Sequence, residues 1–369
     1  MELLLLLLVF PLVWPWIARY KWQAAITWEE MTLNIVICVA LTAGIWYVGV
    51  FTKASDIEIL NGEVVGKARE RVSCEHSYSC NCRSERYCDS DGKNCSTTEA
   101  CDTCYEHSYD YDWVVHSNAG DFRINRVDRQ GVSEPPRFSV VQKSQPVALA
   151  HQFVNYIKAA PESLFNKRSS VVEGFAGQLP DYPDQPYDYH YVNRVIPVGV
   201  AVPDLASWNF DLALLLRELG PAKQANVVIV FTKFDDPMYA RALEAHWLGG
   251  KKNDIIVIIG TPEYPKIAWA DVVSWTDNEL FKVELKDALF QTGTVDRAKV
   301  FALVRTHTLK SFTRKPMSEF SYLKYEIDPP LWAMILAIIV AIGGSIGLSW
   351  YFHREDVRIF GGRSPRTWR

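Results

Sequence analysis

The sequence predicts an α/β domain and a small β-rich, cysteine-stapled region, carried by three transmembrane helices. Three observations lead to this fold class. Long, mostly uncharged apolar segments lie near both ends of the 369-residue chain. Cysteine is concentrated in one stretch, since all but one of the 8 cysteines fall between Cys74 and Cys104. From Val195 onward, apolar runs of strand length alternate with helical patterns, which is typical of α/β domains.

The apolar segments that are expected to lie in the membrane are residues 1–18, 33–52 and 331–352. A spanning helix needs about 20 apolar residues, which the second and third segments supply. The first segment is short and contains Pro11 and Pro15. Because it has neither a basic start nor an evident cleavage site, we interpret it as a retained anchor, with a cleaved signal peptide as the alternative.

Basic residues predict the orientation of these helices. The tail 353–369 is rich in arginine, and Arg19 and Lys21 lie in the short loop between the first two segments. Lys and Arg near membrane spans concentrate on the cytoplasmic side. We therefore expect a multi-pass protein whose loop and tail are cytoplasmic and whose residues from Lys53 to Pro330 are extracytoplasmic.

An extracytoplasmic location favours disulfides over a metal for the cysteine cluster. The cluster comprises Cys74, Cys80, Cys82, Cys88, Cys95, Cys101 and Cys104. Seven cysteines allow three disulfides and one free thiol, and the pairing does not follow from the sequence. The alternative is a zinc site with four thiolate ligands. Its ligands would be Cys80, Cys82, Cys101 and Cys104, with His76 and His107 nearby.

Residues 53–145 are predicted to form a β-meander that carries the cysteine-rich insertion 74–104. Alternation in Asp56–Leu60, followed by Asn61-Gly62, predicts a strand and a tight hairpin turn. Alternation from Tyr109 to His116 predicts a further strand.

Residues 146–203 are predicted to be a helix from Pro146 to about Ala160, followed by an acidic connecting loop. The carboxylates of this loop are Asp181, Asp184 and Asp188. Three carboxylates are a weak candidate for a calcium site. An exposed, proline-containing loop is the favoured interpretation.

The remaining part of the outer region, 204–312, reads as an α/β domain preceded by a strand over Val195–Val202. The further strands are expected at Val227–Thr232, Asp254–Gly260 and Ile267–Trp275. The helices are expected at Phe210–Leu219, ended by Gly220-Pro221, and at Asp236–Leu248, Glu279–Phe290 and Val295–Phe312.

The passage from the first buried strand to the second resembles the TPM domain family. It contains Tyr239-Ala240 in the helix, then Trp247-Leu248-Gly249-Gly250-Lys251-Lys252-Asn253-Asp254 before the strand, with Thr276-Asp277 further on. The resemblance covers about Asp204 to Lys310. It implies an extracytoplasmic α/β sandwich, whose relatives include acid phosphatases, calcium binders and proteins of membrane-complex assembly and repair.

Carboxylates near the strand ends are the candidates for phosphoryl chemistry, namely Asp235, Asp236 and Asp254. Capping of the following helix by Asp235 or Asp236 is the favoured alternative. The position after the second strand, often charged in the family, reads Thr261-Pro262-Glu263, which weighs against catalysis.

Two functions follow from these observations. The favoured one is a membrane protein that presents an extracytoplasmic binding or scaffold domain in the cell envelope, similar to membrane proteins of large bacteriophages. Its expected partners are membrane lipid and an envelope protein, with no cofactor. The alternative is a membrane-anchored metal-dependent acid phosphatase of the TPM type. Zinc at the cysteines or calcium at the acidic loop are the alternative cofactors. With a net charge of -4 and no basic patch, nucleic-acid binding is not expected.

Overall fold

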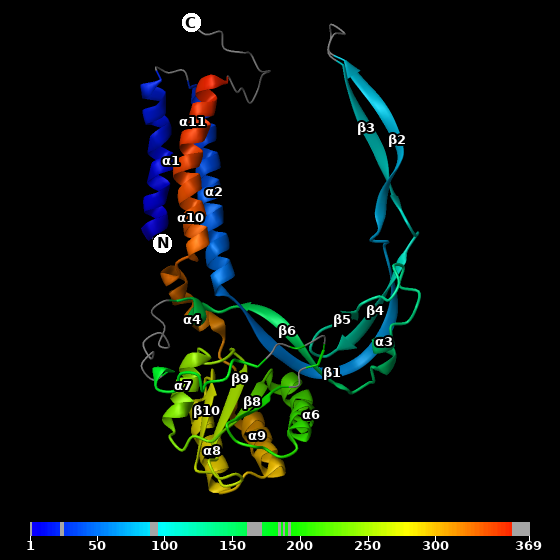
Figure 1. Ribbon diagram of the computed structural model, residues 1–369, viewed down its shortest axis with the longest axis vertical. Helices are drawn as coiled ribbons and strands as arrows, with labels where there is room; N and C mark the ends of the chain where they lie inside the picture. Colours follow the sequence, from blue (N-terminus) through cyan, green and yellow to red (C-terminus); the bar gives the residue numbers. More distant parts are fainter. Residues whose placement is uncertain are drawn as a thin grey trace.

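The computed structural model describes residues 2–22, 26–88, 95–160, 172–183, 186, 189–190 and 193–355, without the side chains of 86–88 and 95–96. Three parts are distinct in Figure 1: a helical bundle, a curved sheet that extends into a two-stranded arm, and an α/β domain. The polypeptide passes from the bundle into the sheet, then through the α/β domain, and back to the bundle.

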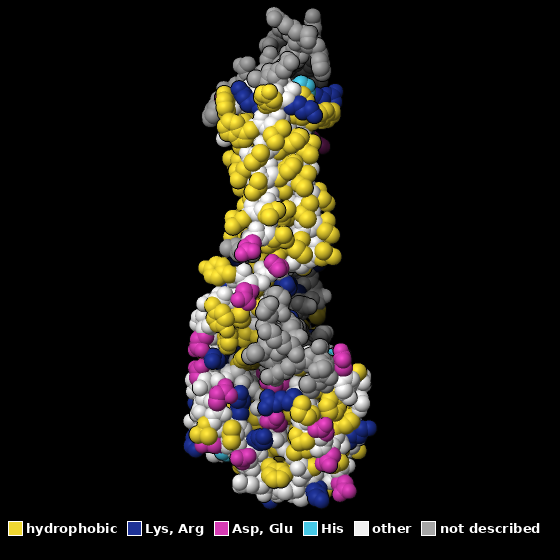
Figure 2. Space-filling model, turned by 90° about the vertical axis from the view of Figure 1, so that its left-hand side faces the viewer, with side chains coloured by type: hydrophobic (Ala, Val, Ile, Leu, Met, Phe, Trp, Pro, Cys, Tyr) yellow, Lys and Arg dark blue, Asp and Glu magenta, His cyan; other side chains and the backbone are white. Residues whose placement is uncertain are grey.

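Three helices form the bundle, and each is long and apolar enough to span a membrane. They are α1 (Glu2–Lys21), α2 (Trp28–Ala54) and a continuous third helix made of α10 (Leu331–Ile338), the π-helical segment η3 (Ile339–Gly344) and α11 (Ser345–Arg354). Figure 2 shows hydrophobic side chains covering the shaft of the bundle, with Lys and Arg gathered at the end away from the folded domains. The three predicted membrane segments are therefore helices of spanning length.

Small side chains bring the third helix close to α2. Every fourth residue of the third helix is small and buried, namely Ala333, Ala337, Ala341, Ser345 and Ser349. A Cβ atom on Gly49 of α2 would lie 2.5 Å from the Cβ of Ala333. Asn34 of α2 donates from Nδ2 to the Ser345 carbonyl at 3.0 Å and to Ser349 Oγ at 2.9 Å. Close approach and interhelical hydrogen bonds are the usual means by which membrane helices associate.

The sheet next to the bundle is antiparallel and has the strand order β5-β4-β1-β6. Its strands are β1 (Ser55–Val72), β4 (Asp110–Ser117), β5 (Phe122–Ile124) and β6 (Pro146–Val154), with the short helix α3 (Pro136–Val140) after β5. The N-terminal half of β1 pairs with β6 and its C-terminal half pairs with β4. The expected strand over Tyr109–His116 is confirmed as β4.

Two predictions for this sheet are wrong. Asn61-Gly62 is not a hairpin turn, because both residues lie within β1 and pair with Ala148 and Val147 of β6. Both residues make contacts with distant segments instead. A Cβ atom on Gly62 would collide with Asn118, and the Asn61 amide donates a hydrogen bond of 3.2 Å to the Ala225 carbonyl.

The helix expected from Pro146 to Ala160 is also wrong. That segment forms β6, and only the single turn α4 (Tyr156–Ala159) is helical. Short apolar runs do not distinguish helix from strand. Here a ladder with β1 decides in favour of a strand, and Pro146 stands at its first residue, where proline is tolerated.

The cysteine-rich insertion is an arm of two long antiparallel strands, β2 (Ser77–Cys88) and β3 (Cys95–Tyr105). These strands pair only with each other within the described residues. Figure 1 shows the arm leaving the sheet and rising beside the bundle, at the height of the bundle.

The α/β domain has the strand order β10-β9-β8-β7, with β7, β8 and β9 parallel and β10 antiparallel. The strands are β7 (Val195–Val198), β8 (Asn226–Thr232), β9 (Asp254–Gly260) and β10 (Trp269–Ser274). The helices are α6 (Leu205–Lys223), α7 (Met238–His246), α8 (Glu279–Gln291) and α9 (Arg297–Ser311), and the 3₁₀ helix η2 (Met317–Glu326) leads back to the bundle. Helices α6, α8 and α9 cover one face and α7 covers the other, so the domain is a sandwich with a buried sheet.

The expected strands and helices of this domain are confirmed except at two points. The strand from Val195 ends at Val198, and α6 runs through Gly220-Pro221 instead of ending there. Gly220 serves packing, because a Cβ atom at this position would collide with the backbone of Asn61 in β1. This glycine lets α6 pack directly on the sheet.

Candidate functional site

The carboxylates predicted for phosphoryl chemistry lie at opposite ends of the parallel strands of the α/β sheet. Strands β8 and β9 are parallel, with Asn226 opposite Asp254 and Thr232 opposite Gly260. Asp235 and Asp236 follow the carboxyl end of β8 and are exposed, whereas Asp254 opens β9 and is completely buried. No group of three or more potential metal ligands among the described residues includes any of these three aspartates. They do not form one centre.

Asp236 stabilises the start of α7. Its Oδ1 accepts a hydrogen bond of 2.9 Å from the Met238 backbone N–H, and its carbonyl accepts one from Tyr239 at 3.1 Å. A carboxylate at the start of a helix satisfies donors that have no partner within the helix. The N-cap residue of α7 is Pro237, so Asp236 is not the cap that the sequence favours but supports the helix from one position earlier.

Asp254 is held by three donors at the other edge of the sheet. Its Oδ1 accepts from Asn226 Nδ2 at 2.8 Å, and its Oδ2 accepts from the Tyr182 hydroxyl at 2.8 Å and the Lys251 N–H at 2.7 Å. Burial raises the pKa of Asp254 to about 6, and these hydrogen bonds offset part of that rise. With both oxygens engaged, the side chain acts as an anchor for the surrounding segments.

The residues before Asp254 join the α/β domain to β1. Lys252 Nζ lies 3.1 Å from Oε1 of Glu58, which is 1% exposed. Arg314 lies 3.1 Å from the other oxygen of Glu58. Lys251 pairs with Asp56, and Asn253 Nδ2 donates to the Ile59 carbonyl at 2.7 Å. The stretch on which the family resemblance depends is thus an interface between domains in this chain.

The weak calcium candidate is only partly described. Asp181 is exposed, and Asp184 and Asp188 lie outside the described residues. Calcium binding at this loop stays a prediction.

Two disulfides hold the arm. Cys80 is bonded to Cys104 and Cys82 to Cys101, with Cα atoms 5.8 and 4.0 Å apart. Disulfide formation is therefore confirmed for four of the predicted cysteines. These four are the ligands of the zinc alternative, and sulfur in a disulfide is not a thiolate, so that alternative applies only to a reduced arm.

The other cysteines of the cluster have different positions. The backbones of Cys88 and Cys95 face each other in the strand register, and their side chains lie outside the described part. Cys74, just before the arm, is a buried free thiol.

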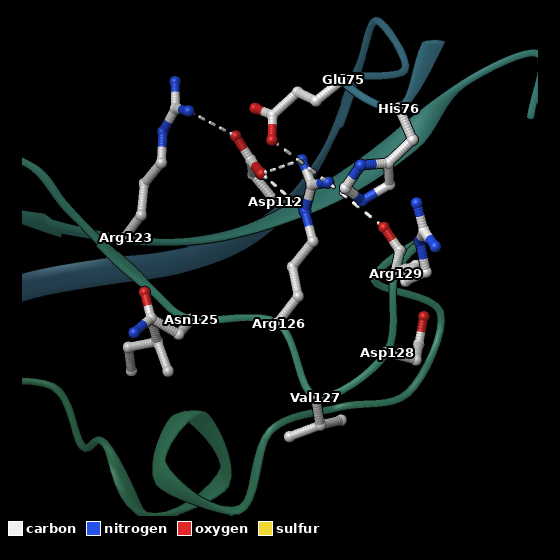
Figure 3. Close-up of a pocket in the computed structure, with 10 residues that line it drawn as sticks. Glu75, His76, Asp112, Arg123, Asn125, Arg126, Val127, Asp128 and Arg129 are labelled. Atoms are coloured by element: carbon white, nitrogen blue, oxygen red, sulfur yellow. Dashed lines mark hydrogen bonds and ion pairs between the residues drawn. The ribbon is translucent and has the colours of Figure 1, made fainter. Parts of the chain in front are cut away.

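Charged side chains surround a cavity of about 580 Å³ at the root of the arm. Figure 3 shows Arg126 at its centre, reaching Asp112 and Glu75. Arg126 lies 2.6 Å from Asp112, 3.0 Å from Asp110 and 3.6 Å from Glu75. Arg123 pairs with the other oxygen of Asp112 at 2.7 Å. The positive charges of Arg123 and Arg126 are thus neutralised by carboxylates. Because Arg126 pairs both with β4 and with Glu75 at the start of the arm, the network holds the arm to the sheet.

Cys74, His107 and Asp110 meet beside this cavity. Cys74 Sγ lies 3.9 Å from His107 Nδ1, which in turn lies 3.4 Å from Asp110 Oδ1. Burial raises the pKa of Asp110, but the Glu75 N–H and the Arg126 cation together hold this pKa below its ordinary value. The side chain of Asp110 has no exposed surface.

Sequence reasoning named Cys74 and His107 but missed Asp110. The signal lies in the strand register, because the pairing of Val72 with Asp110 brings the two feet of the arm together. That register could not be read from either segment alone.

Comparisons of the chain with protein-family models, with curated proteins and with solved structures found no match. The resemblance to the TPM family therefore stays a prediction, and the function is argued from the geometry described above.

Proposed function

We propose that this chain is a multi-pass membrane protein that presents an extracytoplasmic binding scaffold, and that the arm β2–β3 is the element offered to an envelope protein. The observation that carries this proposal is the isolation of the arm. Within the described residues, its strands pair only with each other and add nothing to the core of either domain.

The energetics of the arm support a role in recognition. A lone two-stranded ribbon is marginally stable in water. The two disulfides compensate, because each stabilises a short closed loop by about 2–4 kcal/mol. A ribbon that needs such support and buries no core serves the fold poorly, but it keeps two strand edges available for a partner.

The surface of the arm suits a protein partner. Both outer edges carry backbone N–H and C=O groups that have no strand partner in the described part of the chain and that another chain can pair with. Tyr78 and Tyr105, near the root, are 53% and 57% exposed. Exposed tyrosines are frequent centres of protein–protein binding energy.

The TPM-like sandwich serves, in this proposal, as the base that holds the arm. The alternative of a metal-dependent acid phosphatase has less support, because Asp254 is separated from Asp235 and Asp236 by the length of the strands. The carboxylates that a phosphoryl-transfer centre needs would have to converge at one edge.

The proposed orientation rests on the charged end of the bundle. Arg19 and Lys21 end α1, and Arg354 ends α11. Stacking of Trp22 on His353 brings these ends together. Since Lys and Arg favour the cytoplasmic side, that end is assigned to the cytoplasm and the arm to the outside.

An impermeant thiol reagent tests this orientation in intact cells. The reagent should label a cysteine introduced at Leu280 but not one introduced at Arg354. The reverse labelling pattern would show that the topology is inverted.

Photo-crosslinking in intact cells tests the binding role. A photoreactive amino acid is placed at Tyr78 or Tyr105 and, as a control, at Leu280, which is 59% exposed on α8. We expect one discrete protein adduct from the arm positions and none from Leu280. This adduct should disappear when Cys80 and Cys82 are both changed to Ser. Equal adducts from all three positions, or none from the arm, would contradict the proposal.

A further inference from the structure

We propose that Cys74, His107 and Asp110 form a binding site for a divalent transition-metal ion, with zinc preferred, at the root of the arm. This inference goes beyond the proposed scaffold function and does not depend on it. The site is also distinct from the zinc alternative within the arm, whose four sulfurs are joined in disulfides.

The three side chains already stand at coordinating distances. Their ligand atoms all lie within 4.8 Å of one another. A tetrahedral zinc ion has Zn–S near 2.3 Å and Zn–N or Zn–O near 2.1 Å, which requires S···N of about 3.6 Å and N···O of about 3.4 Å. The observed distances are 3.9 Å from Cys74 Sγ to His107 Nδ1 and 3.4 Å from there to Asp110 Oδ1. These two distances differ from the required ones by a few tenths of an ångström at most, and Cys74 Sγ lies within 4.8 Å of a carboxylate oxygen of Asp110.

An unsatisfied oxygen points to a ligand at this place. Asp110 Oδ1 is buried and has no hydrogen-bond partner among the described residues, and it lies 3.4 Å from Nδ1 of His107. The other oxygen, Oδ2, accepts from the Glu75 N–H at 3.1 Å and from Arg126 at 3.0 Å. Buried acceptors without partners are costly. A cation would satisfy Oδ1, while Arg126 and Glu75 already hold the carboxylate in position, as outer groups do around bound metals.

The same three residue types could also form a nucleophilic triad, but the geometry excludes it. In a triad, the carboxylate orients one ring nitrogen of the histidine and the other nitrogen contacts the nucleophile. Here both Cys74 and Asp110 face Nδ1 of His107. Two groups converging on one nitrogen leave room for an ion between them and give no path for a proton relay.

The ligand set favours zinc over calcium or magnesium. A thiolate and an imidazole are ligands of zinc and related ions, whereas calcium and magnesium prefer oxygen. Cys74 lies in the segment between β1 and β2, where the chain enters the arm, and His107 and Asp110 lie where the chain leaves it. A bound ion would therefore clamp the two feet of the arm together.

Metal binding by the full-length protein, purified in detergent without reductant and stripped with a chelator, tests the site. The wild type is expected to bind one zinc ion and, with cobalt, to show the thiolate charge-transfer band. Cys74→Ser and His107→Gln should each weaken zinc binding by about 10–100-fold, and Cys74→Ser should remove the band.

Two matched controls separate this site from other cysteines and histidines. Cys38→Ser removes the buried free thiol in α2, and His76→Gln removes the neighbouring histidine of the cavity. Both should bind zinc as the wild type does. The proposal fails if the wild type binds no stoichiometric zinc, or if Cys74→Ser retains wild-type affinity. Equal melting temperatures of the stripped variants show that a loss of binding is not a loss of folding.

Discussion

The hydroxyl group of Tyr182 donates a hydrogen bond of 2.8 Å to Oδ2 of Asp254, a carboxyl group that is entirely buried at the start of β9. Tyr182 belongs to the acidic loop that connects the two folded domains, and its ring also packs edge-on against Trp247. The acid that a family pattern marks as a catalytic candidate is thus bound to the loop that covers this edge of the sheet. We therefore expect ionisation of Asp254 to change the stability of the folded protein.

The stability of the protein should depend on the ionisation of Asp254. The pKa of Asp254 is raised from 3.8 in the unfolded chain to about 6 in the folded protein. A raised carboxyl pKa means that the folded state holds the proton more tightly. The resulting stabilisation is complete below the unfolded value and is lost as pH rises through about 6.

Asp254→Asn cannot titrate and provides the comparison. Between about pH 4 and pH 7, the stability of the wild type should fall relative to this variant by up to about 3 kcal/mol. Melting curves of both full-length proteins across this range provide the measurement. A difference that is constant with pH would show that the carboxyl group titrates normally.

Removal of Glu58 should destabilise the junction between β1 and the α/β domain. Glu58 is 1% exposed and faces Lys252 and Arg314, so Glu58→Ala leaves two partly buried cations without their anion. We expect a loss of about 3–5 kcal/mol, seen as a lower melting temperature. Glu279→Ala, which removes an exposed ion pair with Lys282, should cost less than about 1 kcal/mol. Similar losses in both variants would show that the ion pairs of Glu58 contribute no more to the free energy of unfolding than an exposed ion pair does.

Asn34→Ala should weaken the helical bundle. The variant loses the two hydrogen bonds from α2 to Ser345 and Ser349 on the third helix. Such bonds between membrane helices average about 0.6 kcal/mol, with a maximum near 1.7 kcal/mol. Unfolding in a detergent denaturant measures the change, and Val36→Ala, at a position 58% exposed on the same helix, is the control. An effect no larger than that of the control would show that these hydrogen bonds do not stabilise the bundle.

Most of the seven clustered cysteines of the mature protein should resist alkylation. In denaturant without reductant, Cys38 and Cys74 are expected to react, and the two bonded pairs of the arm are not. Mass spectrometry of the digested protein assigns each label. Labels on all four bonded cysteines of the arm, together with an equal amount of zinc, would establish the zinc alternative. Labels on Cys88 and Cys95, in addition to Cys38 and Cys74, would show that the cluster holds two disulfides and not the three that the sequence allows.

Elements with strong local signals were predictable from the sequence. Strand β9 has the expected bounds, Asp254–Gly260, because an uninterrupted apolar run that is rich in β-branched residues and follows Gly249-Gly250 is typical of a buried strand. The membrane helices were equally clear from length and hydropathy. These features need no information about distant parts of the chain.

Elements that depend on distant partners were not predictable in this way. Gly62 and Gly220 read locally as turn and helix-end signals, but each serves close contact with a segment far along the chain. The same holds for the candidate metal site, since Cys74 and His107 lie 33 positions apart and meet only through the register of β1 with β4. Sequence periodicity carries no information about such register.

The direction of the arm has a consequence for the protein in a bilayer. Figure 1 places the arm at the height of the bundle, so a flat membrane around the bundle would extend to the arm as well. The arm carries the exposed charges of Arg83, Glu85 and Glu99. Each would cost roughly 3 kcal/mol or more in hydrocarbon. A flat membrane is therefore compatible with this protein only if the arm leaves its root in a direction that avoids the lipid, and the side chains at the root would then determine how far the arm stands from the bilayer.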